Sequence, residues 1–217
     1  MKQRKRPHNL THYAQRRVIG FLGIALPILV VAISIILPVK ERWTILDSIS
    51  AYYYTSAIPI FVGLLFALAV FLYVYGGYEG DIADRCLCKI SGTAALGVIF
   101  FPTKAPDGFI EPQWWMDWMR PVHYVSATFL FVTFILFSMW LFRRTAAETK
   151  EEMSTGKRLR NKVYFWCGVI MIVSILWAAS SLWTKHPIFI PEAIALIAFS
   201  VSWLTKGRTV RWLKSLW

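Results

Sequence analysis

The sequence has few of the residues that build disulfide-rich or metal-binding proteins. Among 217 residues there are three cysteines, four histidines and twelve acidic residues. Cys86 and Cys88 form a pair without other ligands, which is a poor metal motif, and no disulfide is expected. The sequence also has no glycine-rich nucleotide motif, zinc-protease motif or serine-nucleophile elbow. The enzyme classes that these motifs identify are therefore not indicated by this sequence.

Apolar residues, by contrast, are abundant. They make up 57% of the chain and aromatic residues 16%, whereas only 17% of residues are charged. A soluble domain of this length could not bury so much apolar surface while exposing so little charge. The composition therefore predicts a membrane protein.

Six runs are long and apolar enough to approach the about 20 residues that cross a bilayer core. They cover Val18–Val39, Ala57–Tyr75, Cys86–Phe101, Val122–Phe142, Val163–Trp183 and Ile188–Thr205. The third run is the shortest and contains Lys89, whose side chain we expect to reach back to the interface. The predicted fold is an all-α integral membrane protein, a bundle of six transmembrane helices. Three pairs of small residues four apart, Gly63 and Ala67, Thr93 and Gly97, and Ser174 and Ala178, are predicted to allow close helix packing.

Basic residues are distributed unequally between the two sides of such a bundle. Nineteen of the 24 Lys and Arg residues lie before the first run, after the last run, or in the second and fourth loops, with Lys89 at the start of the third run counted with the second loop. Basic residues near helix ends stay in the cytoplasm, so both termini are predicted to be cytoplasmic and the protein to lie in the inner (plasma) membrane.

This topology divides the chain into three predicted parts. Residues 1–17 form a basic cytoplasmic arm, 18–205 the transmembrane domain, and 206–217 a basic amphipathic tail along the anionic inner leaflet. The net charge of +12 follows from the same bias, so membrane lipids are predicted partners and nucleic acid is not.

The outer face collects polar and aromatic residues, beginning with the stretch SISAYYYT at residues 48–55. Tyrosines at this depth are typical of an interfacial anchor, but here they are accompanied by acids and histidines on short loops. We therefore predict an outward-facing ligand pocket. Its candidate residues are Asp47, Ser48, Ser50, Tyr52, Tyr53, Tyr54, Lys104, Asp107, Glu111, Arg120, His123, Ser126, His186 and Glu192.

Two of these candidates stand at helix starts. His123 follows Pro121, and Ser126 continues a polar stripe on the same helix face. Glu192 follows Pro191 in a first helical turn, where an acid is favourable beside the helix dipole. Each residue is open to a structural reading, as a hydrogen-bonding or helix-start residue, and to a functional one, as part of the pocket lining.

The segments SISAYYYT, YGGYE, FFPT and HYVSATFLF resemble a bacterial group of small six-span membrane proteins of unknown function, distantly DRAM-like. The resemblance covers roughly residues 47–204 and implies architecture and membrane location. A more distant similarity is to the superfamily of alkaline ceramidases and adiponectin receptors, whose hydrolases hold zinc with three histidines. This chain lacks the paired histidines of their last helix.

Three functions stay open on the sequence alone. The first is binding of a lipid or small amphiphile in the outer pocket. The second is the role of an accessory subunit, with a protein partner in the membrane. The third is a metal-dependent hydrolase built on His123 and His186 with Asp107 or Glu192. The cofactor, including a metal or heme at the two histidines, is left undetermined.

Overall fold

The computed structural model describes residues 7–39, 45–75, 82–144 and 155–209. These described residues are mostly helical and contain no strand, which confirms the predicted all-α class. The six long helices are α1 (Pro7–Ile36), α2 (Ile58–Val74), α3 (Ile82–Phe100), α4 (Met119–Met139), α5 (Thr155–Thr184) and α6 (Phe189–Lys206). Two short 3-10 helices, η1 (Ser50–Tyr54) and η2 (Leu141–Arg143), precede α2 and follow α4.

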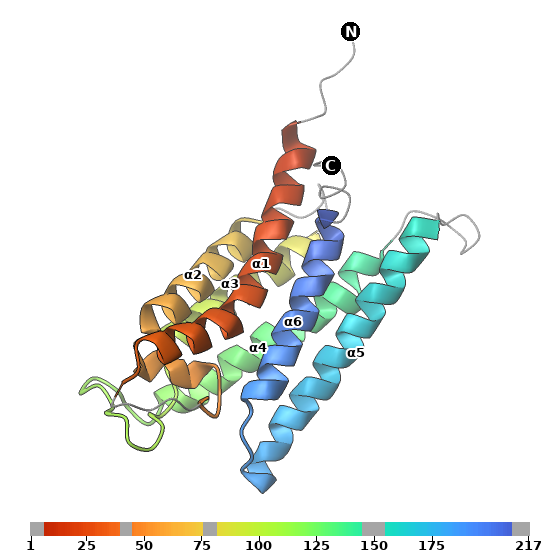
Figure 1. The fold of residues 1–217 in the computed structure, drawn as a ribbon. Coiled ribbons are helices and arrows are strands. Elements are labelled where there is room, and N and C mark those ends of the chain that lie inside the picture. Colours follow the sequence, from red (N-terminus) through yellow and green to blue (C-terminus); the bar gives the residue numbers. More distant parts are fainter. Residues whose placement is uncertain (1–6, 40–44, 76–81, 145–154, 210–217) are drawn as a thin grey trace.

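The helices form a closed ring. Each packs against the next along the chain, and α6 packs against α1 (Figure 1). Successive helices run in opposite directions, so alternate connections lie at the same end. We call the end where α1 and α5 begin and α6 finishes the basic end. The opposite end, which contains residues 45–57, 101–118 and 185–188, is called the aromatic end.

Within the part of the chain that the structure describes, four helical segments are long and apolar enough to cross a membrane: His12–Ile36, Met119–Arg143, Thr155–Thr184 and Phe189–Lys206. This finding supports a membrane protein. Helix α2 is apolar but has only 17 residues, and α3 carries charged residues in its first turns.

Two helices begin well before the apolar runs that predicted them. Helix α1 is helical from Pro7 rather than Val18, and α5 from Thr155 rather than Val163. An apolar run marks the part of a helix that lipid or protein covers, whereas the helix continues into polar residues as long as its backbone hydrogen bonds do. Residues 1–6 of the predicted arm and 210–217 of the predicted tail lie outside the described residues.

Small residues set the closest helix contacts. A Cβ atom on Gly97 of α3 would overlap the Ser126 hydroxyl of α4, so this contact requires glycine. The prediction for Gly63 was wrong, because nothing lies within 4 Å of the position of its Cβ atom. The core itself is aromatic around α6, where Phe134 and Phe199 stack with ring centroids 3.6 Å apart.

Candidate functional site

The tyrosine stretch folds into the short helix η1 at the aromatic end. Ser48 Oγ accepts a hydrogen bond from the Ala51 N–H at 3.1 Å and lies 3.2 Å from Ser50 Oγ, so the two serines start this helix. The Tyr52 side chain is only 1% exposed. Its hydroxyl accepts a hydrogen bond from the Leu46 N–H at 3.3 Å. Tyr52 is therefore a core residue of the first loop.

The first loop is joined to the start of α6 by three hydrogen bonds. The Glu192 carboxylate accepts one from the Ile49 N–H at 2.7 Å. The Asp47 carbonyl oxygen accepts two, from the N–H groups of Ile188 and Phe189, at 2.6 and 2.8 Å. These bonds use backbone groups that a helix start leaves without an intrahelical partner. Glu192 thus acts as a connector between two segments 143 positions apart in the chain.

A second group of ring side chains holds residues 101–103, directly after α3. Three successive carbonyl oxygens accept hydrogen bonds there: Phe101 from His123 Nδ1 at 2.9 Å, Pro102 from Trp115 Nε1 at 3.1 Å, and Thr103 from the Tyr54 hydroxyl. A carbonyl only accepts, so His123 carries its hydrogen on Nδ1.

Tyr53 and Tyr54 are partly buried beside this segment. The Tyr53 ring packs edge-on against Phe61, with centroids 6.3 Å apart. Burial, with the nearby Glu111 charge, raises the pKa of Tyr54 to about 12. Its hydroxyl therefore stays protonated over the whole physiological range and acts as a hydrogen-bond donor.

The other predicted residues are more exposed. Lys104, Asp107 and Arg120 are exposed, whereas Glu111 is half-buried and accepts a hydrogen bond from the Ala105 N–H at 3.3 Å. Arg120 Nε donates to the Tyr124 hydroxyl at 3.3 Å, one turn along α4. They form the surface of the aromatic end.

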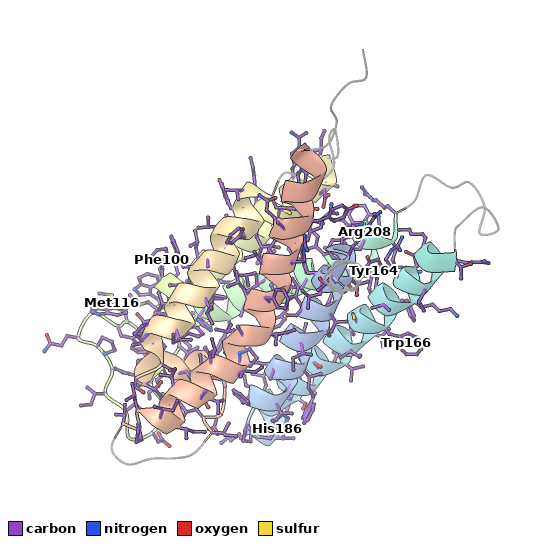
Figure 2. The ribbon with its side chains drawn as sticks, turned by 45° about the horizontal axis from the view of Figure 1, so that its top comes forward. Phe100, Met116, Tyr164, Trp166, His186 and Arg208 are labelled. Atoms are coloured by element: carbon purple, nitrogen blue, oxygen red, sulfur yellow. The ribbon has the colours of Figure 1, made fainter. Side chains whose placement is uncertain are left out.

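His186 stands apart from His123 in its contacts. Its Nε2 lies 2.9 Å from Ser180 Oγ in the last turns of α5, and its Nδ1 lies 3.0 Å from the carbonyl oxygen of the neighbouring residue Pro187. Figure 2 shows His186 at the lower end of the bundle. Within residues 7–39, 45–75, 82–144 and 155–209, no three His, Cys, Asp or Glu side chains are grouped to hold a metal.

Apart from the surface residues Lys104, Asp107, Glu111 and Arg120, most of the predicted outer residues are part of the stabilising contacts of the aromatic end. Asp47 and Glu192 join the first loop to α6, and Ser48, Ser50 and Tyr52 form hydrogen bonds within that loop. Tyr54 and His123 fix the segment after α3. His186 bonds locally. The contacts of these groups go mainly to backbone groups, which is the arrangement of a stabilising framework.

Ser126 belongs to a different feature, a groove of about 670 Å³ between α3 and α4. Its walls are mostly apolar and include exposed Phe100, Val125 and Phe129, and Lys89 lies at one end. Phe100 is labelled on the left of Figure 2. The groove gives the aromatic end a place for an elongated apolar molecule.

A cavity at the basic end was missed by the sequence reasoning. It has a volume of about 150 Å³, and its lining residues are Tyr13, Arg16, Arg144, Lys157, Arg160, Tyr164, Lys206 and Arg208. Figure 2 shows Tyr164 and Arg208 close together at this end. The signal in the sequence was the excess of basic residues, which the positive-inside rule explained without a site.

Comparison of the chain with known protein families, curated proteins and solved structures gave no match. The resemblance to bacterial six-span proteins stays a prediction.

Proposed function

We propose that the chain is a six-span plasma-membrane protein that binds a phospholipid of the outer leaflet in the groove between α3 and α4. The basic end then faces the cytoplasm, as the positive-inside rule requires. Helices α2 and α3 complete the six spans, because they close the ring between α1 and α4. A 17-residue helix is about 26 Å long, a mismatch that a bilayer accommodates by thinning.

The position of the groove in the bilayer supports this occupant. Its lining on α3 runs from Lys89 to Phe100, with Phe101 directly after the helix, and on α4 from Val125 to Phe129. Lys89 and Phe100 are eleven residues apart along α3, a rise of about 17 Å, which is just over half of the about 30 Å hydrocarbon core. The groove therefore covers about one leaflet, measured from the aromatic end, and its apolar walls suit an acyl chain.

Charged and aromatic residues at the start of α4 and directly before it suit a phospholipid headgroup. Arg120 is exposed at the start of α4, with its guanidinium carbon 5.6 Å from the centroid of the Tyr124 ring. A guanidinium is well matched to phosphate oxygens. Trp114 and Trp118 are about half exposed on the preceding segment, as in an aromatic belt at headgroup level.

Filling the groove tests the proposal. Val125 lines it and is 56% exposed, whereas Val173 on α5 is 58% exposed and does not line it. We expect Val125→Trp to reduce the phospholipid that stays bound to the purified protein after extended detergent washing. Val173→Trp, which adds the same ring at equal exposure, is expected to retain it. Equal phospholipid phosphorus per protein in both variants would contradict the proposal.

A second candidate, an accessory subunit of a membrane complex, is favoured by one observation. The loop at the aromatic end exposes large apolar side chains, with Ile110 at 82% and Met116 at 54%. Such patches are typical of protein interfaces. A photo-crosslinking residue at position 110 is expected to capture one defined membrane protein in intact cells, and crosslinks to lipid alone would remove this candidate.

A further inference from the structure

Several hydroxyl groups within the helices of this chain are hydrogen-bonded to the preceding turn. Thr128 Oγ1 donates to the Tyr124 carbonyl oxygen at 2.7 Å, and Ser200 Oγ donates to that of Leu196 at 2.8 Å. Such bonds satisfy serine and threonine side chains in helices that have no water around them. Ser126 on α4 differs, because its hydroxyl has no hydrogen-bond partner among the residues that the structure describes.

The Ser126 side chain is directed at Gly97 of α3. A Cβ atom at position 97 would overlap Ser126 Oγ, so the glycine leaves the space that this hydroxyl occupies. Ser126 is half-buried, and both residues line the groove between α3 and α4. The hydroxyl is therefore part of the groove wall, where a hydrogen-bond acceptor carried by a bound molecule can reach it.

Ser126 lies about one helical turn inside the aromatic end. Its neighbour Gly97 is three residues before Phe100, where α3 ends, which is a rise of about 4.5 Å. At the outer end of the groove, the ring of Phe101 packs against that of Trp118, with centroids 5.6 Å apart. Tryptophans of an aromatic belt lie at headgroup level. One turn further in, the ester groups of a phospholipid meet its acyl chains.

An ester carbonyl oxygen is the acceptor that a lipid offers at this depth. In an apolar groove an unpaired hydroxyl costs free energy, because no water replaces the missing partner. A hydrogen bond from the hydroxyl to the carbonyl removes this cost. A phospholipid with ether-linked chains has the same headgroup and the same shape but lacks the carbonyl oxygen, so it leaves the Ser126 hydroxyl without this partner.

We propose that the groove selects ester-linked phospholipids, and that the Ser126 hydroxyl donates a hydrogen bond to an ester carbonyl oxygen of the bound lipid. This selection rests on the function proposed above, because it requires a phospholipid in the groove. Thr93 also carries a hydroxyl and lines the groove, but it lies four residues further inward than Gly97, a rise of about 6 Å. Thr93 is therefore at the depth of the acyl chains, and Ser126 is the residue that determines specificity.

A competition between two lipids provides the test. The full chain is purified in neutral detergent and exchanged against a large excess of diacyl and dialkyl phosphatidylcholine, in equal amounts and with chains of the same length. The bound lipids are extracted, and their ratio is measured by mass spectrometry. We expect the wild type to hold about fivefold more diacyl than dialkyl lipid, which is the effect of one hydrogen bond of ordinary strength.

Two variants of α4 that each lose one hydroxyl group are compared. Ser126→Ala keeps the Cβ atom beside Gly97 and is expected to bring the ratio of the two lipids close to one. Thr128→Val is the control, because Thr128 is exposed and does not line the groove, and it is expected to keep the ratio of the wild type. The ratio is measured within one sample, so a smaller fraction of folded protein does not change it.

The outcomes separate the role of Ser126 from lipid binding itself. Equal amounts of the two lipids on the wild type, or an unchanged ratio in Ser126→Ala, would overturn the selection by Ser126 while leaving a phospholipid in the groove. Loss of the preference in Thr93→Val instead would place the carbonyl group deeper and would also overturn it. Total bound phospholipid that Val125→Trp does not reduce would contradict the proposed function as well.

Discussion

Removal of the Glu192 carboxylate is predicted to weaken the aromatic end, because Glu192 joins α6 to the first loop. Its Oε2 accepts a hydrogen bond of 2.7 Å from the Ile49 N–H, and Ile49 is itself buried. The loss of this bond leaves a buried donor without a partner, which costs about 1–3 kcal/mol. Glu192→Ala is therefore expected to lower the free energy of unfolding by about 2 kcal/mol.

Glu111 offers a control with the same chemistry. Its carboxylate also accepts a hydrogen bond from a backbone N–H, that of Ala105, but at 3.3 Å. A longer bond at a more polar position is weaker. Glu111→Ala is therefore expected to cost less than 1 kcal/mol, on the same scale of hydrogen-bond contributions.

Thermal unfolding in detergent compares the two variants. For a chain of this length, about 2 kcal/mol corresponds to a fall of about 4–8 °C in the unfolding midpoint. Glu192→Gln keeps an acceptor without the charge and is expected to fall between the wild type and Glu192→Ala. If Glu111→Ala lowers the midpoint as much as Glu192→Ala, the assigned role of Glu192 is wrong.

Three further predictions concern other parts of the molecule. His123→Ala is expected to lower stability by about 1–3 kcal/mol in the same assay, because the Phe101 carbonyl loses its partner. Burial raises the pKa of Tyr54 to about 12 in the folded protein, whereas a tyrosine in the unfolded chain ionises near pH 10. The contribution of Tyr54 to stability is therefore full below pH 10 and is lost as the pH rises toward 12. Tyr54→Phe is expected to make the alkaline fall in stability shallower. The topology is tested with single cysteines placed at Gln113 or Gly156 in a variant without native cysteines. A membrane-impermeant thiol reagent is expected to label position 113 in intact cells and position 156 only after lysis. The reverse result would invert the topology.

The sequence predicted the helices well where composition alone decides them. The runs for α2 and α6 differ from the observed helices by one residue at each end. Apolar composition identifies a span because the bilayer requires it. It does not identify which side of the span meets protein, and Gly63, predicted at a contact, has no neighbour within 4 Å. Both lipid and protein interior are apolar, so the rotation of a helix about its axis is weakly encoded.

At the aromatic end, the sequence identified the residues but left their partners open. Tyr52, His123 and Glu192 were each expected at the outer face, and each was open to a structural and a functional reading. Their observed partners are the backbone groups of Leu46, Phe101 and Ile49. Residue type shows that a polar group at this depth needs a partner, but only the path of the loops decides which group supplies it.

The basic end shows why counting charges does not locate a site. Helix α5 carries basic residues at 157, 158, 160 and 162, which lie on different faces of the helix. Only Lys157 and Arg160 reach the cavity, where they meet Arg16 from α1 and Lys206 from α6. This convergence depends on α6 packing between α1 and α5, a long-range contact that no local pattern specifies. A topology rule treats the four α5 residues as equivalent, whereas the packed ring separates them into two that line a cavity and two that face outward.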